Sequence, residues 1–475
     1  MKKIVVSLLL LCTVVFNTIA LTACPGGYIE LDLTGAYDGS DVTITFTHSM
    51  GQDNRAVLDD AIARFNKIYP NIHVEHSSLG DYDTVFKTVQ TQLTGSGEKY
   101  PNFAFCYPDH VATYNRSEST ICLDDLINST AVVAGTNETM GFSKAQLDDF
   151  IEVYYNEGKS YGDGKMYSLP FQKSTEVLYY NATVFEELGL EEPKTWDDVY
   201  NCAVALKNAY PNSTPIGYDS EENFFITLCE QSNTAYTDAS KDDPFVFVND
   251  ENKAIMAKFA EWYKSGLFTT SSLASAGTGQ TSSYTSDYFT KGNDDAGKIF
   301  MSIGSSAGAR YQRPDKVNGE YPFEVGVAPV PQENEANKKV ISQGPSVCIF
   351  EKSNVQEVYA SWLLIKFLLT DMQFQTQYAM KSGYVPVIKS VLESDIYQKH
   401  LAKADGGDYL TASVAVVTFE QEDYYFFSDV FDGSVVAREQ VGLLVNELFS
   451  KYEIGKDNSA IINKAFENAY DRCQD

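Results

Sequence analysis

Gly304-Ser-Ser-Ala-Gly308 has the residue types and spacing for covalent catalysis by a serine. In α/β-hydrolases the Gly-x-Ser-x-Gly pattern follows a strand and presents the serine at a sharp turn. Here it follows a predicted strand over residues 298–303, so Ser306 would be the nucleophile. Such an enzyme needs an acid and then a histidine later in the chain. Only His400 follows, in a predicted polar helix, and no His-Gly-Gly-Gly oxyanion segment is present, so an esterase has weak support.

Pairs of adjacent carboxylates could indicate a glycosidase instead. They occur at Asp124-Asp125, Asp148-Asp149 and Asp197-Asp198. The two acids of a glycosidase must face each other across a cleft, whereas adjacent acids in an acidic chain mostly occupy first turns of helices or solvated surfaces. A secreted glycosidase or serine hydrolase is therefore the alternative function, and a binding function without catalysis is favoured.

Metal, cofactor and nucleic-acid chemistry find no support in the sequence. The five histidines form no His-x-x-x-His pattern, and the cysteines after the N-terminal segment are scattered, without Cys-x-x-Cys spacing. No P-loop or dinucleotide-binding glycine pattern is present. Net charge is −29, from 36 basic and 65 acidic residues, and nucleic-acid binding requires Lys and Arg to neutralise phosphates. We expect no metal, no cofactor and no nucleic-acid partner.

The N-terminus predicts export. Met1-Lys-Lys3 is a charged start, residues 4–20 are apolar, and Leu21-Thr-Ala-Cys24 ends the segment with small residues before a cysteine. Residues 1–23 are a predicted signal peptide. The Leu-x-Ala-Cys ending resembles a bacterial lipobox, which implies cleavage before Cys24, acylation of its thiol and an extracytoplasmic, membrane-anchored protein. Ordinary cleavage with Cys24 in a disulfide is the alternative. Residues 24–40 show little periodicity and are interpreted as a tether.

The next segments predict the start of a parallel sheet. Strand patterns at 42–46, 72–74 and 103–106 alternate with amphipathic helices at 55–69 and 82–93. This β-α-β-α-β order is typical of an α/β fold with helices covering the sheet. Ligands of such sheets bind beyond the carboxyl ends of the strands. Those ends lie at residues 48–51, 80–82 and 107–109.

Residues 174–200 carry the strongest family signal. The motifs are Ser174-Thr-x-Val-Leu-Tyr-Tyr-Asn181, Phe185-x-x-x-Gly-Leu190 and Pro193-x-Thr-Trp-x-Asp198, and Gly383-Tyr-Val-Pro386 follows later. This set resembles the family-1 extracellular solute-binding proteins of bacterial ABC importers, in particular those that bind glycerol-3-phosphate or oligosaccharides.

The resemblance implies a periplasmic-binding-protein-like α/β fold. Two α/β lobes, each built from discontinuous segments, would be joined by a hinge with three crossings near residues 174, 343 and 385. The ligand would lie in the cleft between the lobes. The implied N-terminal lobe is 41–173 plus 344–384, and the C-terminal lobe is 174–343 plus 385–475.

The resemblance also implies a set of ligand-binding residues by motif position. The family's acidic position after the third strand is occupied by Pro108, with Asp109 next to it. Hydroxyl groups and a backbone N–H suit a polyol or phosphate oxygens, and an arginine can hold a phosphate bidentately. The implied residues are Tyr82, Asp109, Ser174, Ser305, Gly344, Tyr384 and Arg438.

The function implied by the resemblance is solute capture for transport. A monomeric lipoprotein would bind a carbohydrate or a glycerol-3-phosphate-type solute outside the membrane and deliver it to the permease subunits of an ABC transporter. A purely adhesive lipoprotein would not explain the hinge motifs.

Overall fold

The computed structural model describes residues 33–95, 100–117, 119–276 and 284–474, together with two short strands, β1 (Thr22–Ala23) and β2 (Ile29–Glu30). The predicted lipidation residue Cys24 and most of the predicted signal peptide lie outside the described residues. Within the described ranges, no helix is long and apolar enough to cross a membrane.

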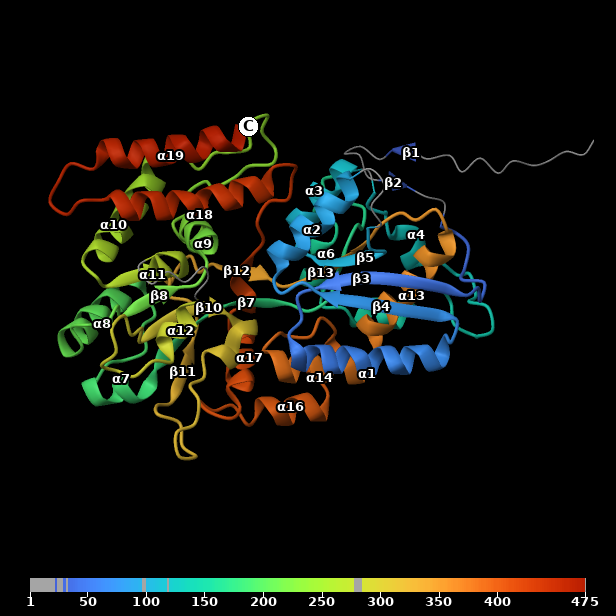
Figure 1. The fold of residues 1–475 in the computed structure, drawn as a ribbon, viewed down its shortest axis with the longest axis horizontal. Helices are drawn as coiled ribbons and strands as arrows, with labels where there is room; N and C mark the ends of the chain where they lie inside the picture. The colour runs from blue at the N-terminus through green and yellow to red at the C-terminus, as the bar shows by residue number, and fades with distance from the viewer. Residues whose placement is uncertain are drawn as a thin grey trace, which may run out of the picture.

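Two sheets form two lobes that lie side by side (Figure 1). The sheet of the first lobe has the order β4-β3-β5-β13-β6, and β3 pairs in parallel with both β4 and β5, which confirms the predicted parallel start. β13 is antiparallel to β5 although more than two hundred residues separate them in sequence. The strands are β3 (Val42–His48), β4 (Ile72–Ser78), β5 (Phe103–Cys106), β6 (Leu169–Pro170) and β13 (Ser346–Ile349).

Helices cover both faces of this sheet. One core contains buried side chains of α1 (Gln52–Ile68), α13 (Val355–Thr370) and α14 (Met372–Ser382). A second core contains those of α2 (Tyr82–Thr94) and α3 (Pro108–Tyr114). The smaller helices of the first lobe are η1 (Asn115–Ser117), α4 (Asp124–Asn128), α5 (Lys144–Asp149), α6 (Glu152–Glu157), α15 (Lys389–Leu392) and α16 (Asp395–Leu401).

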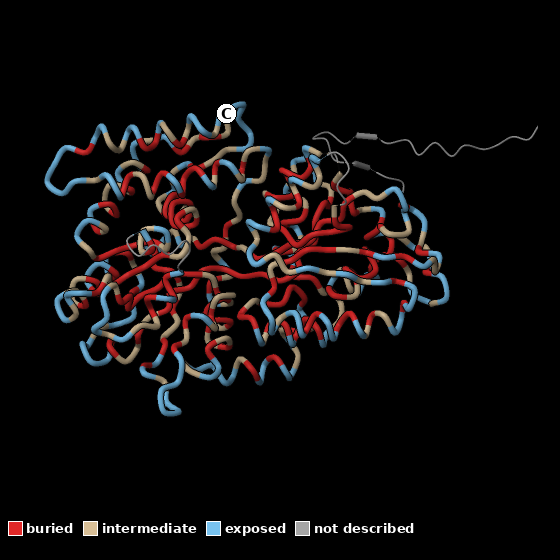
Figure 2. The backbone as a smooth tube through the Cα atoms, viewed as in Figure 1, coloured by how far each residue is buried: buried red, intermediate tan, exposed pale blue. Residues whose placement is uncertain are grey.

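The sheet of the second lobe has the order β14-β12-β7-β10-β8-β9, and β11 also pairs with β7. Its strands are β7 (Ser174–Asn181), β8 (Ile216–Tyr218), β9 (Phe268–Thr270), β10 (Met301–Ser305), β11 (Val325–Ala328), β12 (Val340–Gln343) and β14 (Tyr425–Phe426). The helices are α7 (Ala182–Leu188), α8 (Trp196–Ala209), α9 (Glu221–Gln231), α10 (Asp250–Lys264), α11 (Ser271–Ser275), α12 (Thr285–Phe289), η2 (Ser306–Tyr311), α17 (Leu410–Glu420), η3 (Glu422–Tyr424), α18 (Ser434–Lys451) and α19 (Ser459–Gln474). Buried residues run through both lobes and through the segments that join them (Figure 2).

Local capping explains the helices after β7. The Asn181 side chain accepts the N–H of Val184 at the start of α7, and Gly189 ends that helix with a φ of 64°. Thr195 and Asp198 cap α8 reciprocally. Residues 161–167, which follow α6, contain a turn without flanking strands, and the Tyr167 N–H donates to the Gly158 carbonyl oxygen at 3.1 Å.

The chain passes between the sheets at two short segments. β6 and β7 are separated by residues 171–173, and β12 and β13 by residues 344–345, and in each case the two strands belong to different sheets. At the expected third crossing, Val385 forms a bridge with Lys173.

Two segments pack in the core of the first lobe although the expected boundaries place them outside it. Val387, Val391 and Tyr397, after the expected crossing, are buried in the core of the first lobe, and the change of core comes at α17. Within the expected tether, Leu33 and Tyr37 are buried in the same first core, because apolar side chains there are covered by α13 and its neighbours. Residues 33–40 therefore pack on the lobe.

The six described cysteines are free thiols. Two of them lie on neighbouring strands, where the Cys106 Sγ is 3.6 Å from the Cys348 Sγ. Burial raises the pKa of the Cys106 thiol well above its usual range, so it is held as a neutral thiol.

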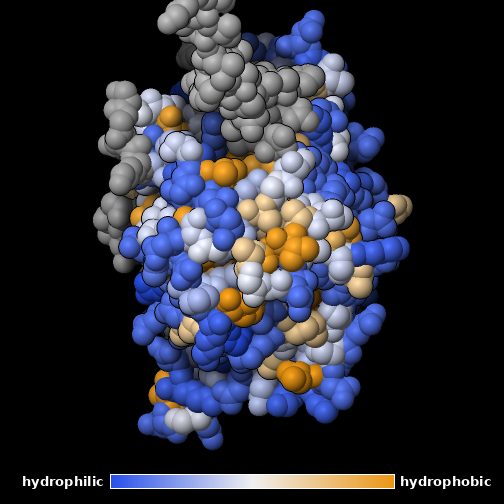
Figure 3. Space-filling model, turned by 90° about the vertical axis from the view of Figure 1, so that its right-hand side faces the viewer, coloured by the Kyte–Doolittle hydropathy of each residue, from blue (hydrophilic) through white to orange (hydrophobic). Residues whose placement is uncertain are grey.

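The end of the molecule formed by the first lobe is mostly hydrophilic, with separate hydrophobic areas among the polar side chains (Figure 3). This agrees with the high negative charge of the chain, which favours a solvated surface.

The crossing glycine Gly344 gives a test of the hinge. Its φ is +107°, and an added Cβ would lie 2.6 Å from the Gln172 carbonyl oxygen and 2.8 Å from the Lys173 Cα. Gly344→Ala is expected to lower the free energy of unfolding by at least about 3 kcal/mol, because backbone strain adds to a collision with main chain. Urea unfolding measures the loss.

Gly319→Ala is the matched control. Gly319 also has a positive φ, +91°, but an added Cβ would have no neighbour within 4 Å. Gly319→Ala should lower the free energy of unfolding by about 1–2 kcal/mol, because only the backbone conformation becomes strained. Equal losses in the two variants would show that the close approach at the crossing is unimportant.

Candidate ligand-binding site

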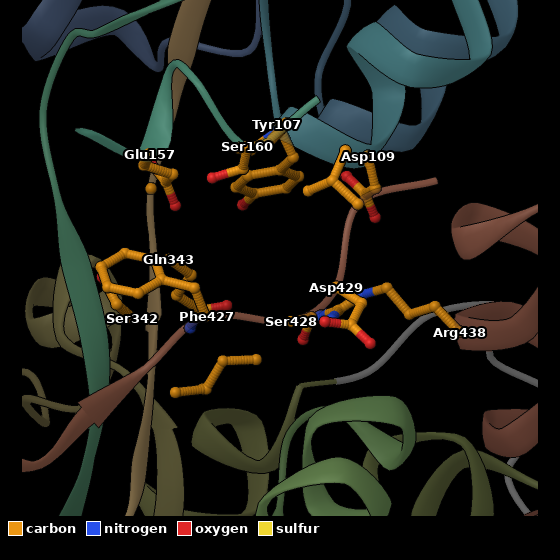
Figure 4. A pocket seen from close by; sticks show the side chains of 14 residues that line it. Tyr107, Asp109, Glu157, Ser160, Ser342, Gln343, Phe427, Ser428, Asp429 and Arg438 are labelled. Atoms are coloured by element: carbon orange, nitrogen blue, oxygen red, sulfur yellow. The ribbon is translucent and has the colours of Figure 1, made fainter. Parts of the chain in front are cut away.

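A cavity lies between the two lobes, and about 550 Å³ of it, partly open to solvent, is free of protein atoms. In Figure 4 side chains of the first lobe line one side and those of the second lobe line the other. The first lobe and the segment after α6 contribute Tyr107, Pro108, Asp109, Glu157 and Ser160. The second side is formed by Ile341, Ser342, Gln343, Gly344, Phe427, Ser428, Asp429, Val430 and Arg438.

Arg438 is the cation of this cavity. It lies in the second turn of α18, which begins after Gly433. Its Nη2 donates to Asn223 Oδ1, the one hydrogen bond that Arg438 makes within the described residues. Burial acts to lower the pKa of the guanidinium, but the carboxylates of Asp109 and Glu222 outweigh burial and raise that pKa. A guanidinium has five N–H donors, so several remain available to a ligand.

Asp109 reaches the cavity from the opposite lobe. It is in the first turn of α3, directly after the strand end that was expected to face a ligand, and its Oδ1 accepts the N–H of His110 at 3.0 Å. A carboxylate accepts hydrogen bonds only, so Asp109 can bind hydroxyl groups of a solute.

A group of tyrosines adjoins the cavity. The rings of Tyr107 and Tyr82 have centroids 4.9 Å apart. Burial raises the pKa of Tyr384, and a hydrogen bond with Tyr82 opposes the rise. The phenols stay protonated, so their hydroxyls can donate as well as accept.

A buried ion pair supports the floor of the cavity. The Lys173 Nζ is 2.5 Å from Glu157 Oε2 and 3.3 Å from the Gly344 carbonyl oxygen. Burial raises the pKa of Glu157, and Lys173 offsets part of the rise. Because Lys173 neutralises Glu157, this acid adds little net charge to the cavity.

Two serine hydroxyls of the cavity were missed by sequence reasoning. The Oγ atoms of Ser342 and Ser428 are buried and have no hydrogen-bond partner among the residues that the structure describes. Buried polar atoms are normally paired, so an unpaired hydroxyl facing a cavity indicates a place for a polar ligand atom. Ser342 lies two residues before the predicted crossing glycine, Gly344, which is the only sequence signal for it.

The structure brings together some of the residues predicted from the sequence. Asp109, Gly344 and Arg438 line the cavity, and Tyr82 and Tyr384 lie beside it. Ser174 is buried in β7 opposite Gln343, and Ser305 uses its Oγ to accept the N–H of Ala307 at 3.2 Å. These two serines do not line the cavity.

The patterns that could suggest an enzyme have structural partners. Ser306 is fully buried, and its Oγ accepts the Thr175 N–H at 3.2 Å. Asp124 accepts the Met166 N–H at 3.0 Å, Asp149 accepts from Ser390, and Asp198 caps α8. Among the described residues, no group of three or more His, Cys, Asp or Glu side chains is arranged to hold a metal ion.

Comparisons with known proteins agree on one family. A sequence model of bacterial extracellular solute-binding proteins matches residues 60–404. The sn-glycerol-3-phosphate-binding periplasmic protein UgpB of Escherichia coli K12 is 25% identical over 386 residues, which are 78% of this chain and 80% of that protein.

Solved structures share the fold. UgpB from Mycobacterium tuberculosis in complex with glycerophosphocholine has a TM-score of 0.68 at 17% identity and covers 91% of this chain and 98% of its own. The substrate-binding protein Lmo0181 from Listeria monocytogenes, in complex with cycloalternan, has a TM-score of 0.69 at 17% identity with the same coverage. The match of the family over most of the chain and the two-lobe fold lead to one conclusion: this chain belongs to the bacterial extracellular solute-binding proteins.

Proposed function

We propose that this protein is the lipid-anchored receptor of an ABC importer, and that it binds a hydroxyl-rich solute between its lobes and delivers it to the permease. The observation that carries this is the position of Arg438: a half-buried guanidinium with free donors faces Asp109 of the other lobe across a cavity. Because the donor and the acceptor belong to opposite lobes, a single solute can bind both lobes at once.

The side chains of the cavity favour a solute with several hydroxyl groups. Asp109 and Asp429 would accept hydrogen bonds from hydroxyls, Arg438 would donate, and the hydroxyls of Ser342 and Ser428 lack partners. A neutral sugar or oligosaccharide uses both acceptors and donors. A glycerol phosphate would place its phosphate on Arg438 and its hydroxyls on the aspartates, with repulsion from the same aspartates.

Ion pairs between the lobes support a cleft that closes on its ligand. Arg310 of η2 binds Asp53 of α1, with Nη1 and Oδ2 3.0 Å apart. Arg116 of η1 lies 3.8 Å from Asp432, just before α18. Exposed pairs contribute about 0–1 kcal/mol each, so they can bias closure without locking it.

We propose that binding is not followed by catalysis. The serine and carboxylate motifs that suggested a hydrolase are used for packing, capping and backbone hydrogen bonds. The anchor is proposed from the lipobox-like ending at Cys24 alone.

A ligand panel tests the receptor function. The midpoint temperature of thermal unfolding is measured for the mature protein without its lipid. It should rise when the solute is present, and the solutes to test are maltotriose, other oligosaccharides, simple sugars, glycerol-3-phosphate and glycerophosphocholine. A ligand at about a hundred times its Kd adds about 2.7 kcal/mol, which is readily seen. Shifts with neutral sugars alone or with phosphates alone identify the solute class; no shift with any of these solutes would contradict the proposal.

Removal of the cavity cation tests the site. Arg438→Gln is expected to weaken binding of the active panel member about 10- to 100-fold, because hydrogen bonds to a charged group contribute about 1.5–3 kcal/mol. Isothermal titration calorimetry measures the change. Arg472→Gln is the control, since Arg472 is an exposed residue of α19 beside Glu447. Unchanged affinity in a folded Arg438→Gln protein would rule out this role.

Replacement of Cys24 tests the anchor. In cells that express the full chain, Cys24→Ser should prevent acylation and move the protein from the membrane fraction to the soluble extracytoplasmic fraction. Fractionation with immunoblotting measures this. Retention of the variant in the membrane fraction to the same extent as the parent would disprove lipid anchoring.

A further inference from the structure

A buried carboxylate lies behind the cavity and takes no part in lining it. Glu176, on β7, is 1% exposed. Its Oε1 accepts a hydrogen bond from Asn223 Nδ2 at 2.7 Å, and its Oε2 accepts one from the Tyr218 hydroxyl. Its carbonyl oxygen accepts Gln421 Nε2 at 2.9 Å, which fixes the backbone at this point.

Asn223 connects this carboxylate to the cavity. It is 3% exposed, and its Nδ2 also donates to Gln343 Oε1 at 3.1 Å, while its Oδ1 accepts from Arg438 Nη2. Glu176 needs a donor and Arg438 needs an acceptor, so the Asn223 amide has a single orientation that satisfies both. The chain of contacts is therefore Glu176 to Asn223 to Arg438 to ligand.

We propose that Glu176 and Asn223 are positioning residues that hold Arg438 in place for the solute, and that the protonation of Glu176 controls how firmly it is held. This rests on the proposed function, because Arg438 is taken to bind the solute. Neither residue touches the cavity.

Burial of Glu176 acts on its pKa together with a few titratable and charged neighbours. The titratable and charged groups that face it are Tyr218 and Asp219 from the end of β8 and Arg438 from α18. Burial raises the pKa of Glu176 to about 7, while the hydrogen bonds from Tyr218 and Asn223 and the charge of Arg438 oppose the rise.

A proton on Glu176 weakens the contact that holds Asn223. The ionised carboxylate accepts from both Tyr218 and Asn223, and hydrogen bonds to an ionised acceptor are about twice as strong as neutral ones. When Glu176 is protonated, the Tyr218 hydroxyl can turn and accept. The Asn223 amide cannot turn without losing Arg438, so its bond to Glu176 becomes a weaker, neutral one.

Stability and affinity should therefore change in opposite directions with pH. The folded pKa of Glu176 lies above the ordinary value of 4.5, so the stabilisation that its proton provides is complete below about 4.5 and is lost as pH rises through about 7. Affinity for a neutral sugar should instead rise through about pH 7, because only the ionised form holds Asn223 and Arg438 firmly. Binding of that sugar must then lower the pKa of Glu176.

Carboxyl NMR on the ligand-free mature protein tests the coupling first. Glu176 is assigned by the loss of its signal in Glu176→Gln, and its apparent pKa should be near 7. Arg438→Gln should raise this pKa, because the carboxylate loses a nearby positive charge, and Asn223→Ala should raise it as well, because a donor is removed. Arg472→Gln should leave it unchanged. Titration of Glu176 near 4.5, or an unchanged pKa in Arg438→Gln, would overturn the proposal.

Calorimetry with maltotriose then tests the positioning role. The parent protein should bind maltotriose about five- to tenfold more tightly at pH 8 than at pH 6. Glu176→Gln resembles the protonated form, so it should bind at both pH values with the low affinity that the parent shows at pH 6. The same pH dependence in parent and variant would overturn the positioning role. If maltotriose does not bind at any pH, maltotriose is not the solute and the same two titrations are made with the member of the ligand panel that binds, while the NMR coupling still decides whether Glu176 and Arg438 are linked.

Discussion

Lys173 joins the two segments that pass between the sheets and the segment that contains Val385. Its backbone exchanges hydrogen bonds with Val385, of 3.1 and 2.8 Å, and its ammonium binds the Gly344 carbonyl oxygen and the buried Glu157 carboxylate. One residue of the first crossing is thus bound to the second and to the segment expected to be the third. Breaking a buried pair by removing one partner costs about 3–5 kcal/mol, so the relative position of the crossings is strongly determined. The absence of a Cβ at Gly344 allows these segments to approach so closely.

The site depends on this junction because its two halves come from different sheets. Asp109 and Tyr107 follow β5 of the first sheet, and Ser342 and Gln343 end β12 of the second. Arg438 comes from α18, and its only fixed partner in the described residues is Asn223 of α9. The first lobe thus presents an acceptor and the second a donor, and the junction sets the distance between them.

Local signals in the sequence predicted much of the fold. The caps at Asn181 and Thr195 specify their helices by hydrogen bonds within three residues, so no tertiary information is needed. Local signals do not determine the lobe to which an apolar segment belongs. Val387 and Tyr397 are apolar in either assignment, and only tertiary packing places them in the first core.

The sequence placed some of the cavity residues but not others. Gly344 and Arg438 were expected from family motifs and Asp109 from its place beside the motif position of Pro108, and all three line the cavity. Ser174 and Ser305 share those motifs, but whether a strand side chain reaches a cavity depends on register and on the neighbouring strand. Ser428 could not be predicted, because no motif surrounds it and the first-lobe residues on the other side of the cavity lie far away in sequence.

The place of β13 in the first sheet has a consequence for how the protein matures. β13 lies between β5 and β6, which precede it by well over a hundred residues, and α13 and α14, which complete one core, follow it. The first lobe therefore cannot complete its sheet until residue 349 is available for pairing, and most of the strands of the second lobe precede that residue in the chain. Pairings of such long sequence separation form slowly, since loop closure must come first.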